Sequence, residues 1–206
     1  MPFVTDTYIR RAERDDLDTV VAWMEEPDFQ HFLYGDPARS PRQVREQIVR
    51  MLGGAAQGLP GAIHLLIDST KAGPIGLLSL QQISWRNRSC NLDIYVSKPF
   101  RNTLVTAASV YRALAYCFDE LNLHRVGAMI YAFNRTSWRI FEMTGAQREL
   151  TLENHVPRGG ELHTLYCYGL LRPEFEALKA RYARQAGDVS LRGMAQALAE
   201  SAEREP

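Results

Sequence analysis

Cysteine is scarce in this chain. Cys90, Cys117 and Cys167 are the three cysteines among 206 residues, and no two of them have CxxC spacing. An odd number of scattered cysteines fits neither a disulfide framework nor a zinc motif, so we expect buried thiols in a reducing compartment. The five histidines form neither an HExxH nor an HxH pattern, and the sequence therefore predicts no metal site.

An excess of charge of one sign is also missing. Lys and Arg together number 24, and so do Asp and Glu. A neutral chain without a basic block argues against nucleic acid as the main ligand. Apolar runs stay far below the roughly 18 residues of a membrane helix. The first residues, MPFVTDTYIRRAERDD, show no basic stretch before an apolar block. We expect a cytoplasmic protein that binds neither nucleic acid nor membrane.

What the sequence does contain is an ordinary globular composition. Hydrophobic residues make up 46% and charged residues 23%, values that argue against intrinsic disorder. The length favours one domain. We place this domain at residues 1–185 and expect a polar C-terminal tail at residues 186–206.

Hydrophobic periodicity predicts a mixed order of strands and helices. Strands are expected at residues 5–11, 62–68, 74–85, 89–96, 124–131, 146–154 and 161–170. Helices are expected at residues 15–26, where Pro27 ends the helix, and at 40–52, 103–121, 136–144 and from 173 onward. Residues 28–39 read as an aromatic-rich loop or a broken helix. This order predicts the α/β class, with α+β layers in one domain.

Several short motifs lie on these elements. They are ProIleGly at 74–76, LysProPheArg at 98–101, LeuHisArgVal at 123–126, AsnArgThrSer at 134–137 and PheGluMetThrGlyAla at 141–146. Together they resemble the GNAT superfamily of N-acyltransferases, and most closely the branch of ribosomal-protein N-terminal acetyltransferases. The resemblance covers roughly residues 5–170 by order of elements.

The resemblance implies a mixed, mostly antiparallel sheet in which two central strands, 89–96 and 124–131, splay apart in a V. It implies an enzyme that moves an acyl group from a pantetheine thioester to a primary amine by direct attack, through a tetrahedral intermediate. The donor is then acyl-CoA or an acyl-carrier protein, with no permanently bound cofactor. The acceptor is a small-molecule amine or a protein N-terminus. The alternative is a catalytically inactive GNAT-like binding module.

The resemblance also implies where the donor binds. The backbone of Ile94, Tyr95 and Val96 would pair with pantetheine and supply an oxyanion donor. A Gln/Arg-x-x-Gly-x-Gly/Ala turn would bind pyrophosphate at a helix start. Here the turn corresponds to Arg101, Asn102, Thr103, Leu104 and Thr106. Arg101 fits, whereas Leu104 and Thr106 replace small residues that allow phosphate to approach the backbone. Loss of this cradle with retention of the groove would suit a carrier-bound donor.

Three residues are candidates for the chemistry. Asp93 alternates with Cys90, Leu92 and Ile94 along its strand, and would act as a base through water. Ser137 would hydrogen-bond the leaving thiolate, because Phe141 occupies the position of the tyrosine acid found in many family members. His163 on the last hairpin is a second candidate base.

Contacts to pantetheine and to the acceptor complete the predicted site. Asn134 would contact the pantetheine arm, and it also suits a plain helix N-cap. Glu161 would contact the acceptor and shares a hairpin face with His163, because the two are two positions apart. The alternative is that they are simply an exposed pair on the hairpin. Residues that would shape the acceptor pocket, unless they simply pack in an apolar loop, are His31, Tyr34 and Trp23.

Overall fold

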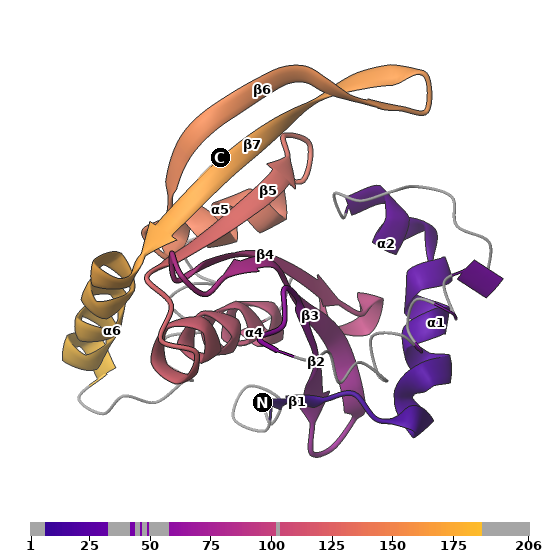
Figure 1. Ribbon diagram of the computed structural model, residues 1–206, viewed down its shortest axis with the longest axis horizontal. Coiled ribbons are helices and arrows are strands. Elements are labelled where there is room, and N and C mark those ends of the chain that lie inside the picture. Colours follow the sequence, from indigo (N-terminus) through magenta and orange to yellow (C-terminus); the bar gives the residue numbers. More distant parts are fainter. Residues whose placement is uncertain are drawn as a thin grey trace.

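The structure is a computed structural model that describes residues 7–32, 42–43, 46, 49, 58–101 and 104–186. Seven strands form one sheet in the order β1-β2-β3-β4-β5-β7-β6 (Figure 1). The strands are β1 (Thr7–Arg11), β2 (Ile63–Ser69), β3 (Gly73–Ser84), β4 (Ser89–Val96), β5 (Arg125–Tyr131), β6 (Gln147–Arg158) and β7 (Glu161–Leu171). Neighbours are antiparallel except β4 and β5. The expected mixed, mostly antiparallel sheet is confirmed.

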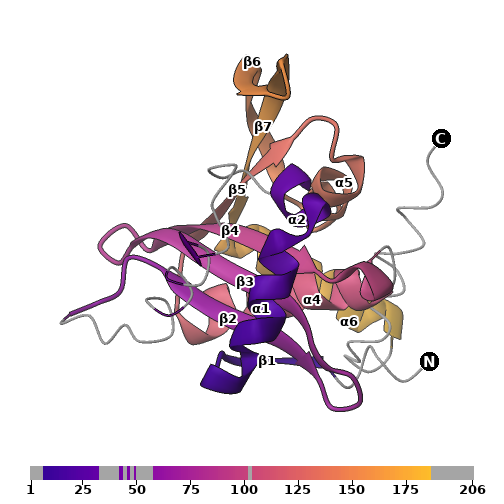
Figure 2. The ribbon, with the colours of Figure 1, turned by 90° about the vertical axis from the view of Figure 1, so that its right-hand side faces the viewer.

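Helices cover both faces of this sheet (Figure 2). They are α1 (Leu17–Glu25), α2 (Pro27–Phe32), α4 (Leu104–Ala115), α5 (Arg135–Met143) and α6 (Arg172–Ala186). Short turns lie at η1 (Arg14–Asp16), η2 (Lys98–Phe100) and η3 (Tyr116–Glu120), the last of which is a π-helix. Helix α1 packs on one face, and apolar side chains of α4, α5 and α6 build the larger core on the other.

Most predicted elements are confirmed, and the differences concern their ends. The helix predicted to stop at Pro27 does so, because α1 ends at Glu25 and Glu26 is extended. Pro27 then begins a second helix, α2, which was not predicted. Proline lacks the N–H that a first helical turn leaves unpaired anyway. Of the helix predicted at 40–52, only residues 42–43, 46 and 49 are described, and they are helical. The predicted tail lies outside the described residues from 187 onward.

The predicted splay between the two central strands is confirmed. β4 and β5 pair in parallel at three positions only, which end at Asn91 and Gly127. At Gly127 the strands are so close that a Cβ atom would lie 2.6 Å from the Asn91 side-chain oxygen. Beyond this point β4 stays paired with β3 and β5 with β7, so the two strands diverge.

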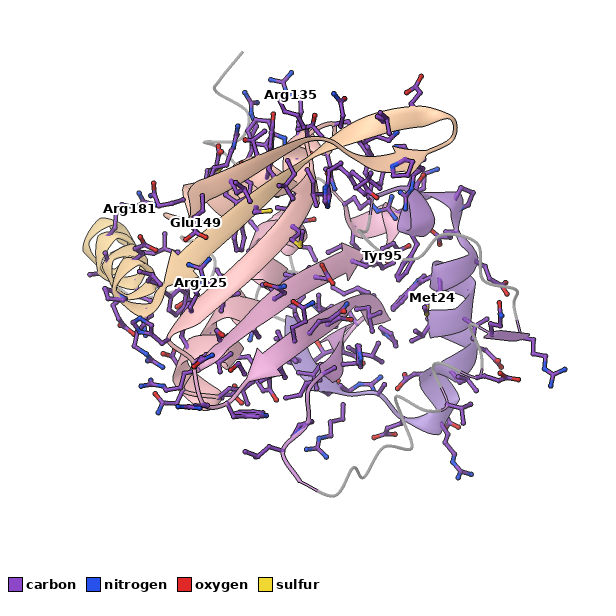
Figure 3. The ribbon with its side chains drawn as sticks, turned by 45° about the horizontal axis from the view of Figure 1, so that its top comes forward. Met24, Tyr95, Arg125, Arg135, Glu149 and Arg181 are labelled. Carbon is purple, nitrogen blue, oxygen red and sulfur yellow. The ribbon has the colours of Figure 1, made fainter. Side chains whose placement is uncertain are left out.

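Strand β4 separates two apolar layers because its side chains alternate. Cys90 and Leu92 lie in the core beneath α4, whereas Tyr95 lies in the smaller cluster with α1. Figure 3 shows Tyr95 at the end of β4, facing the helix that carries Met24. The end of β4 is therefore fixed from both faces, and it holds one side of the V in place.

The β6–β7 hairpin projects beyond the rest of the sheet (Figure 1). Gly159 and Gly160 form its turn with φ angles of 60° and 83°, which glycine adopts readily. The register shifts twice along β6, between Arg148 and Leu150 and between Leu152 and Val156. Bulges of this kind bend an edge strand and re-aim its side chains.

Candidate active site

A cavity of about 610 Å³ opens where β4 and β5 separate. Strands β4 and β5 and helices α2, α4 and α5 all contribute to its wall. The structure brings together there the predicted residues Asp93, Ile94, Tyr95, Val96, Arg101, Thr106, Asn134 and Ser137. The cavity thus joins residues from a strand, a turn and two helices. The first and the last of them are more than forty positions apart in the sequence.

The residues predicted for the acceptor are placed differently. Trp23 is 7% exposed and packs behind the Tyr95 ring, with ring centroids 5.7 Å apart, so it does not line the cavity. His31 and His163 lie behind Phe133, and Glu161 is exposed near the hairpin turn. Tyr34, Asn102 and Thr103 lie outside the described residues, as does the side chain of Leu104.

Asp93 is the carboxylate that β4 contributes to the cavity. Its carboxylate accepts a hydrogen bond of 2.7 Å from the Gln81 amide on β3. Burial raises the pKa of Asp93 to about 6, and the Gln81 hydrogen bond offsets only part of that shift. A carboxylate with a pKa near the working pH is suited to general-base catalysis.

Helix α5 presents its first turn to the cavity. The Asn134 side-chain oxygen accepts a hydrogen bond of 3.4 Å from the Ser137 backbone N–H. Asn134 is therefore the N-cap of α5, which is one of the two roles predicted for it. Ser137 lines the cavity, and Phe141 follows one turn later. The Phe141 ring is 5% exposed and packs edge-on against Tyr168.

Arg101 is held by groups on the α2 side of the cavity. Its Nε donates to the Val96 carbonyl at 2.7 Å, and its Nη1 lies 2.6 Å from the Asp28 carboxylate. The guanidinium also lies 3.8 Å from Glu26 and 5.0 Å from the centre of the Tyr95 ring. The cation that the motif assigned to pyrophosphate is thus ion-paired within the protein.

Tyr95 completes this network. Its hydroxyl donates to the Glu26 carboxylate at 2.8 Å. Burial, together with that neighbouring carboxylate, raises the pKa of Tyr95 to about 12. The phenol therefore stays protonated at neutral pH and keeps Glu26 in place as a hydrogen-bond acceptor.

Five rings form a cluster at the α2 end of the cavity, which we call the ring cluster: His31, Phe32, Tyr131, Phe133 and His163. Phe133 is its centre, stacked on His31 at 4.7 Å and on Tyr131 at 4.9 Å, with His163 edge-on at 5.2 Å. Phe32 and Phe133 line the cavity. Arg158 on β6 donates to the His31 carbonyl at 2.7 Å and so ties the hairpin to α2.

Asp28, Phe32 and Phe133 are cavity residues that sequence reasoning missed. Phe133 directly precedes the recognised AsnArgThrSer motif, and that position was the available signal. Asp28 and Phe32 lie in the segment for which the sequence predicts only an aromatic-rich loop or broken helix. Their place at the cavity follows from the packing of α2 against the end of β4, which no local pattern encodes.

Two further findings concern the described residues. In that part of the chain, no group of three or more His, Cys, Asp or Glu side chains could hold a metal ion. Among the helices described, none is both long enough and apolar enough to cross a bilayer.

Comparison with known proteins places this geometry in context. Residues 6–147 match the family model described as "Acetyltransferase (GNAT) domain". "Uncharacterized N-acetyltransferase p20" of Bacillus licheniformis is 20% identical over 167 residues, 81% of this chain and 93% of that protein. "Putative ribosomal N-acetyltransferase YdaF" of Bacillus subtilis is 30% identical over 115 residues, 56% of this chain and 61% of that protein.

Solved structures share the fold. A spermidine N-acetyltransferase from Vibrio cholerae, determined in complex with CoA and spermine, superimposes with a TM-score of 0.74 at 19% identity. The match covers 83% of this chain and 98% of that one. At this level of identity the likeness concerns the fold alone.

Proposed function

Because the chain belongs to the GNAT family of acetyltransferases, we propose that its cavity transfers an acyl group from a pantetheine thioester to a primary amine. One observation carries the proposal: β4 and β5 part after Asn91 and Gly127, and the cavity lies in the gap. Past that point the edge of β4 is not paired with β5. Its backbone groups are therefore available to the amides of a pantetheine arm.

The reaction needs a neutral amine and a stabilised oxyanion. An α-amine with a pKa of about 8 loses its proton more readily than a lysine amine at about 10.4. The amine attacks the thioester carbonyl and forms a tetrahedral intermediate with a negatively charged oxygen. A backbone N–H of the Ile94–Val96 stretch is the proposed donor to that oxygen, since fixed donors in a water-poor site stabilise it well.

Asp93 is the proposed base. It lines the cavity, and with a pKa of about 6 it is ionised at neutral pH yet basic enough to take a proton through water. His163 is less well placed, because it lies behind Phe133 and not on the cavity wall. When the carbon–sulfur bond breaks, Ser137 donates a hydrogen bond to the thiolate. The thiolate then takes up, through water, the proton that Asp93 removed from the amine, and it leaves as the thiol.

Acyl-CoA is the first candidate for the donor. The Vibrio cholerae structure with CoA supports it, since the two chains share the fold. A carrier protein is the second candidate, because Leu104 and Thr106 replace two small residues of the pyrophosphate turn. Thr106 also donates a hydrogen bond of 3.2 Å to the Phe100 carbonyl, which ties the helix to the turn before it.

A comparison of donors tests these alternatives. We expect kcat/KM for acetyl-CoA to exceed that for the same acetyl group on a holo carrier protein. The substitution Leu104→Gly should raise the acetyl-CoA to carrier ratio further, because a glycine allows phosphate closer to the backbone. A clear preference for the carrier would reverse the order of the two candidates without touching the acyltransferase proposal.

The acceptor is a primary amine. Relatives point two ways, to a polyamine by the spermine complex and to a protein N-terminus by the name of the Bacillus subtilis protein. The decisive experiment measures thiol release from acetyl-CoA with a panel of amines and peptides. Thiol release that depends on the amine supports the proposal, and its absence with every amine and both donors favours an inactive binding module.

A further inference from the structure

The two carboxylates on the α2 side of the cavity already share one cation of the protein, the Arg101 guanidinium. Asp28 is a cavity-lining carboxylate of α2, and Glu26 precedes it at the end of α1. Either carboxylate would be a natural partner for the ammonium groups of a polyamine. Arg101 instead lies 2.6 Å from Asp28 and 3.8 Å from Glu26.

Arg101 is held firmly in this position. Its side chain is 21% exposed, it donates to the Val96 carbonyl at 2.7 Å, and the Tyr95 ring lies below the guanidinium at 5.0 Å. The Tyr95 hydroxyl donates a hydrogen bond to the Glu26 carboxylate, which is therefore already engaged within the protein. A substrate ammonium that sought these carboxylates would have to displace a partly buried ion pair, which is costly.

The remaining wall on this side is aromatic. Phe32 and Phe133 line the cavity with ring centroids 6.3 Å apart, and His31 stacks on Phe133. Arg158 lies directly behind, bound to the His31 carbonyl. Flat rings favour stacked or edge-on contacts with another ring. Arg158 behind them adds positive charge close to this wall, which disfavours a second ammonium.

We infer that the acceptor is an amine that carries an aromatic or bulky apolar group beside its single ammonium, and that Arg101 sets this preference by withholding Asp28 and Glu26 from polycations. The inference rests on the proposed acyl transfer and deepens it. Glu161 is the nearby hairpin carboxylate that could oppose it, because it pairs in register with Arg158 and is exposed.

The test compares 2-phenylethylamine, n-propylamine and spermidine with acetyl-CoA as donor. In the unaltered protein, we expect kcat/KM to be at least about tenfold higher for 2-phenylethylamine than for either other amine, the size of effect that an apolar pocket gives. Two tetrapeptides that begin with Phe or Gly, assayed in parallel, show whether the aromatic group belongs to a small amine or to a peptide N-terminus.

Variants of Arg101 test its role directly. Arg101→Met keeps the apolar stem and frees the two carboxylates, so the ratio of kcat/KM for spermidine to that for 2-phenylethylamine should rise about tenfold. Adding Asp28→Asn to that variant should remove most of the gain. Arg101→Lys, which keeps the charge, is the matched control and should shift the ratio much less.

A second variant guards against misfolding of Arg101→Met. Phe133→Ala should lower the ratio of kcat/KM for 2-phenylethylamine to that for n-propylamine by about tenfold. A higher kcat/KM for spermidine than for 2-phenylethylamine in the unaltered protein overturns the inference but leaves the acyl transfer intact. If that preference for spermidine disappears in Glu161→Gln, Glu161 is the carboxylate that binds the second ammonium. Failure of every amine to release thiol overturns the proposed function and the inference together.

Discussion

The two sides of the cavity are built from different materials. The donor side consists of main chain at the end of β4 and the first turns of α4 and α5, all within residues 92–141. The α2 side consists of side chains from α2, the end of β5 and the hairpin, which are brought together over more than 120 positions of sequence. A surface made of backbone tolerates side-chain substitution, whereas a surface made of distant side chains changes its chemistry with each one.

The largest expected effect comes from the backbone of the donor side. A Cβ atom on Gly76 would collide with the Tyr95 backbone carbonyl on the neighbouring strand. Gly76→Ala must therefore push β4 away from β3, and it should lower the free energy of unfolding by about 2–3 kcal/mol. Urea denaturation measures the loss.

Gly61→Ala is the control for this prediction, because no atom lies within 4 Å of a Cβ built at that position. It should change stability by less than about 0.5 kcal/mol. Equal losses in the two variants would mean that close approach at β4 is not what requires glycine.

Asp93 tests the chemistry of the same side. Asp93→Asn removes the proposed base and should lower kcat by about 10²-fold. In the unaltered protein kcat/KM should fall as the pH drops below about 6, since protonation of Asp93 removes the base. Asp119→Asn makes the same chemical change in a surface ion pair with Lys179 and should keep full activity. A pH profile without a limb near 6 would contradict the assignment.

The raised pKa of Asp93 also has a consequence for stability. Its pKa moves from 3.8 to about 6 on folding, so between these values the folded state binds more protons than the unfolded state. Stability should therefore fall as the pH rises through this window. Asp93→Asn should flatten that fall, as measured by urea denaturation at pH 4 and pH 7. A steeper fall in the variant would show that the carboxylate is stabilised in its charged form.

Ser137 should have a smaller effect than the base. Ser137→Ala removes one hydrogen bond to the leaving sulfur, and kcat should drop by about tenfold, less than the loss of a full oxyanion donor. The free energy of unfolding should barely change, because the Asn134 cap uses the Ser137 backbone N–H, which alanine retains. Asn134→Ala is the comparison, and it should cost about 1 kcal/mol of stability. If both variants keep full turnover, the AsnArgThrSer motif serves only to cap helix α5.

The same contrast explains how far the sequence predicts this molecule. The alternation of β4 and the LeuHisArgVal and AsnArgThrSer motifs predicted the strands and the first turn of α5, because each depends on neighbours in sequence. The splay between β4 and β5 was expected only from the resemblance to the GNAT superfamily. The pairing of Arg101 with Asp28 spans 73 positions and depends on how α2 packs. Trp23 was a candidate for the acceptor pocket because it is aromatic and lies near the aromatic-rich segment. In the structure, helix α1 directs its side chain into the core, where it packs behind Tyr95.

The smallest effect is expected where the hairpin meets α2. Arg158 donates to the His31 carbonyl and lies 5.0 Å from the Tyr131 ring, so it joins β6 to the ring cluster by one hydrogen bond and one cation–π contact. Arg158→Ala loosens this junction. The KM for 2-phenylethylamine should rise about threefold, which corresponds to a net contact of about 0.7 kcal/mol.

The KM for acetyl-CoA is the internal control of that experiment, because the hydrogen bond and the cation–π contact of Arg158 are made to His31 and Tyr131 on the α2 side. Arg158→Lys retains the charge but not the planar donor group. Its KM for 2-phenylethylamine should therefore lie between those of the unaltered protein and Arg158→Ala. If Arg158→Ala raises both KM values equally, the hairpin supports the whole cavity and the two sides are not independent. If only the amine KM rises, the α2 side can be altered one side chain at a time while the backbone groove keeps its donor.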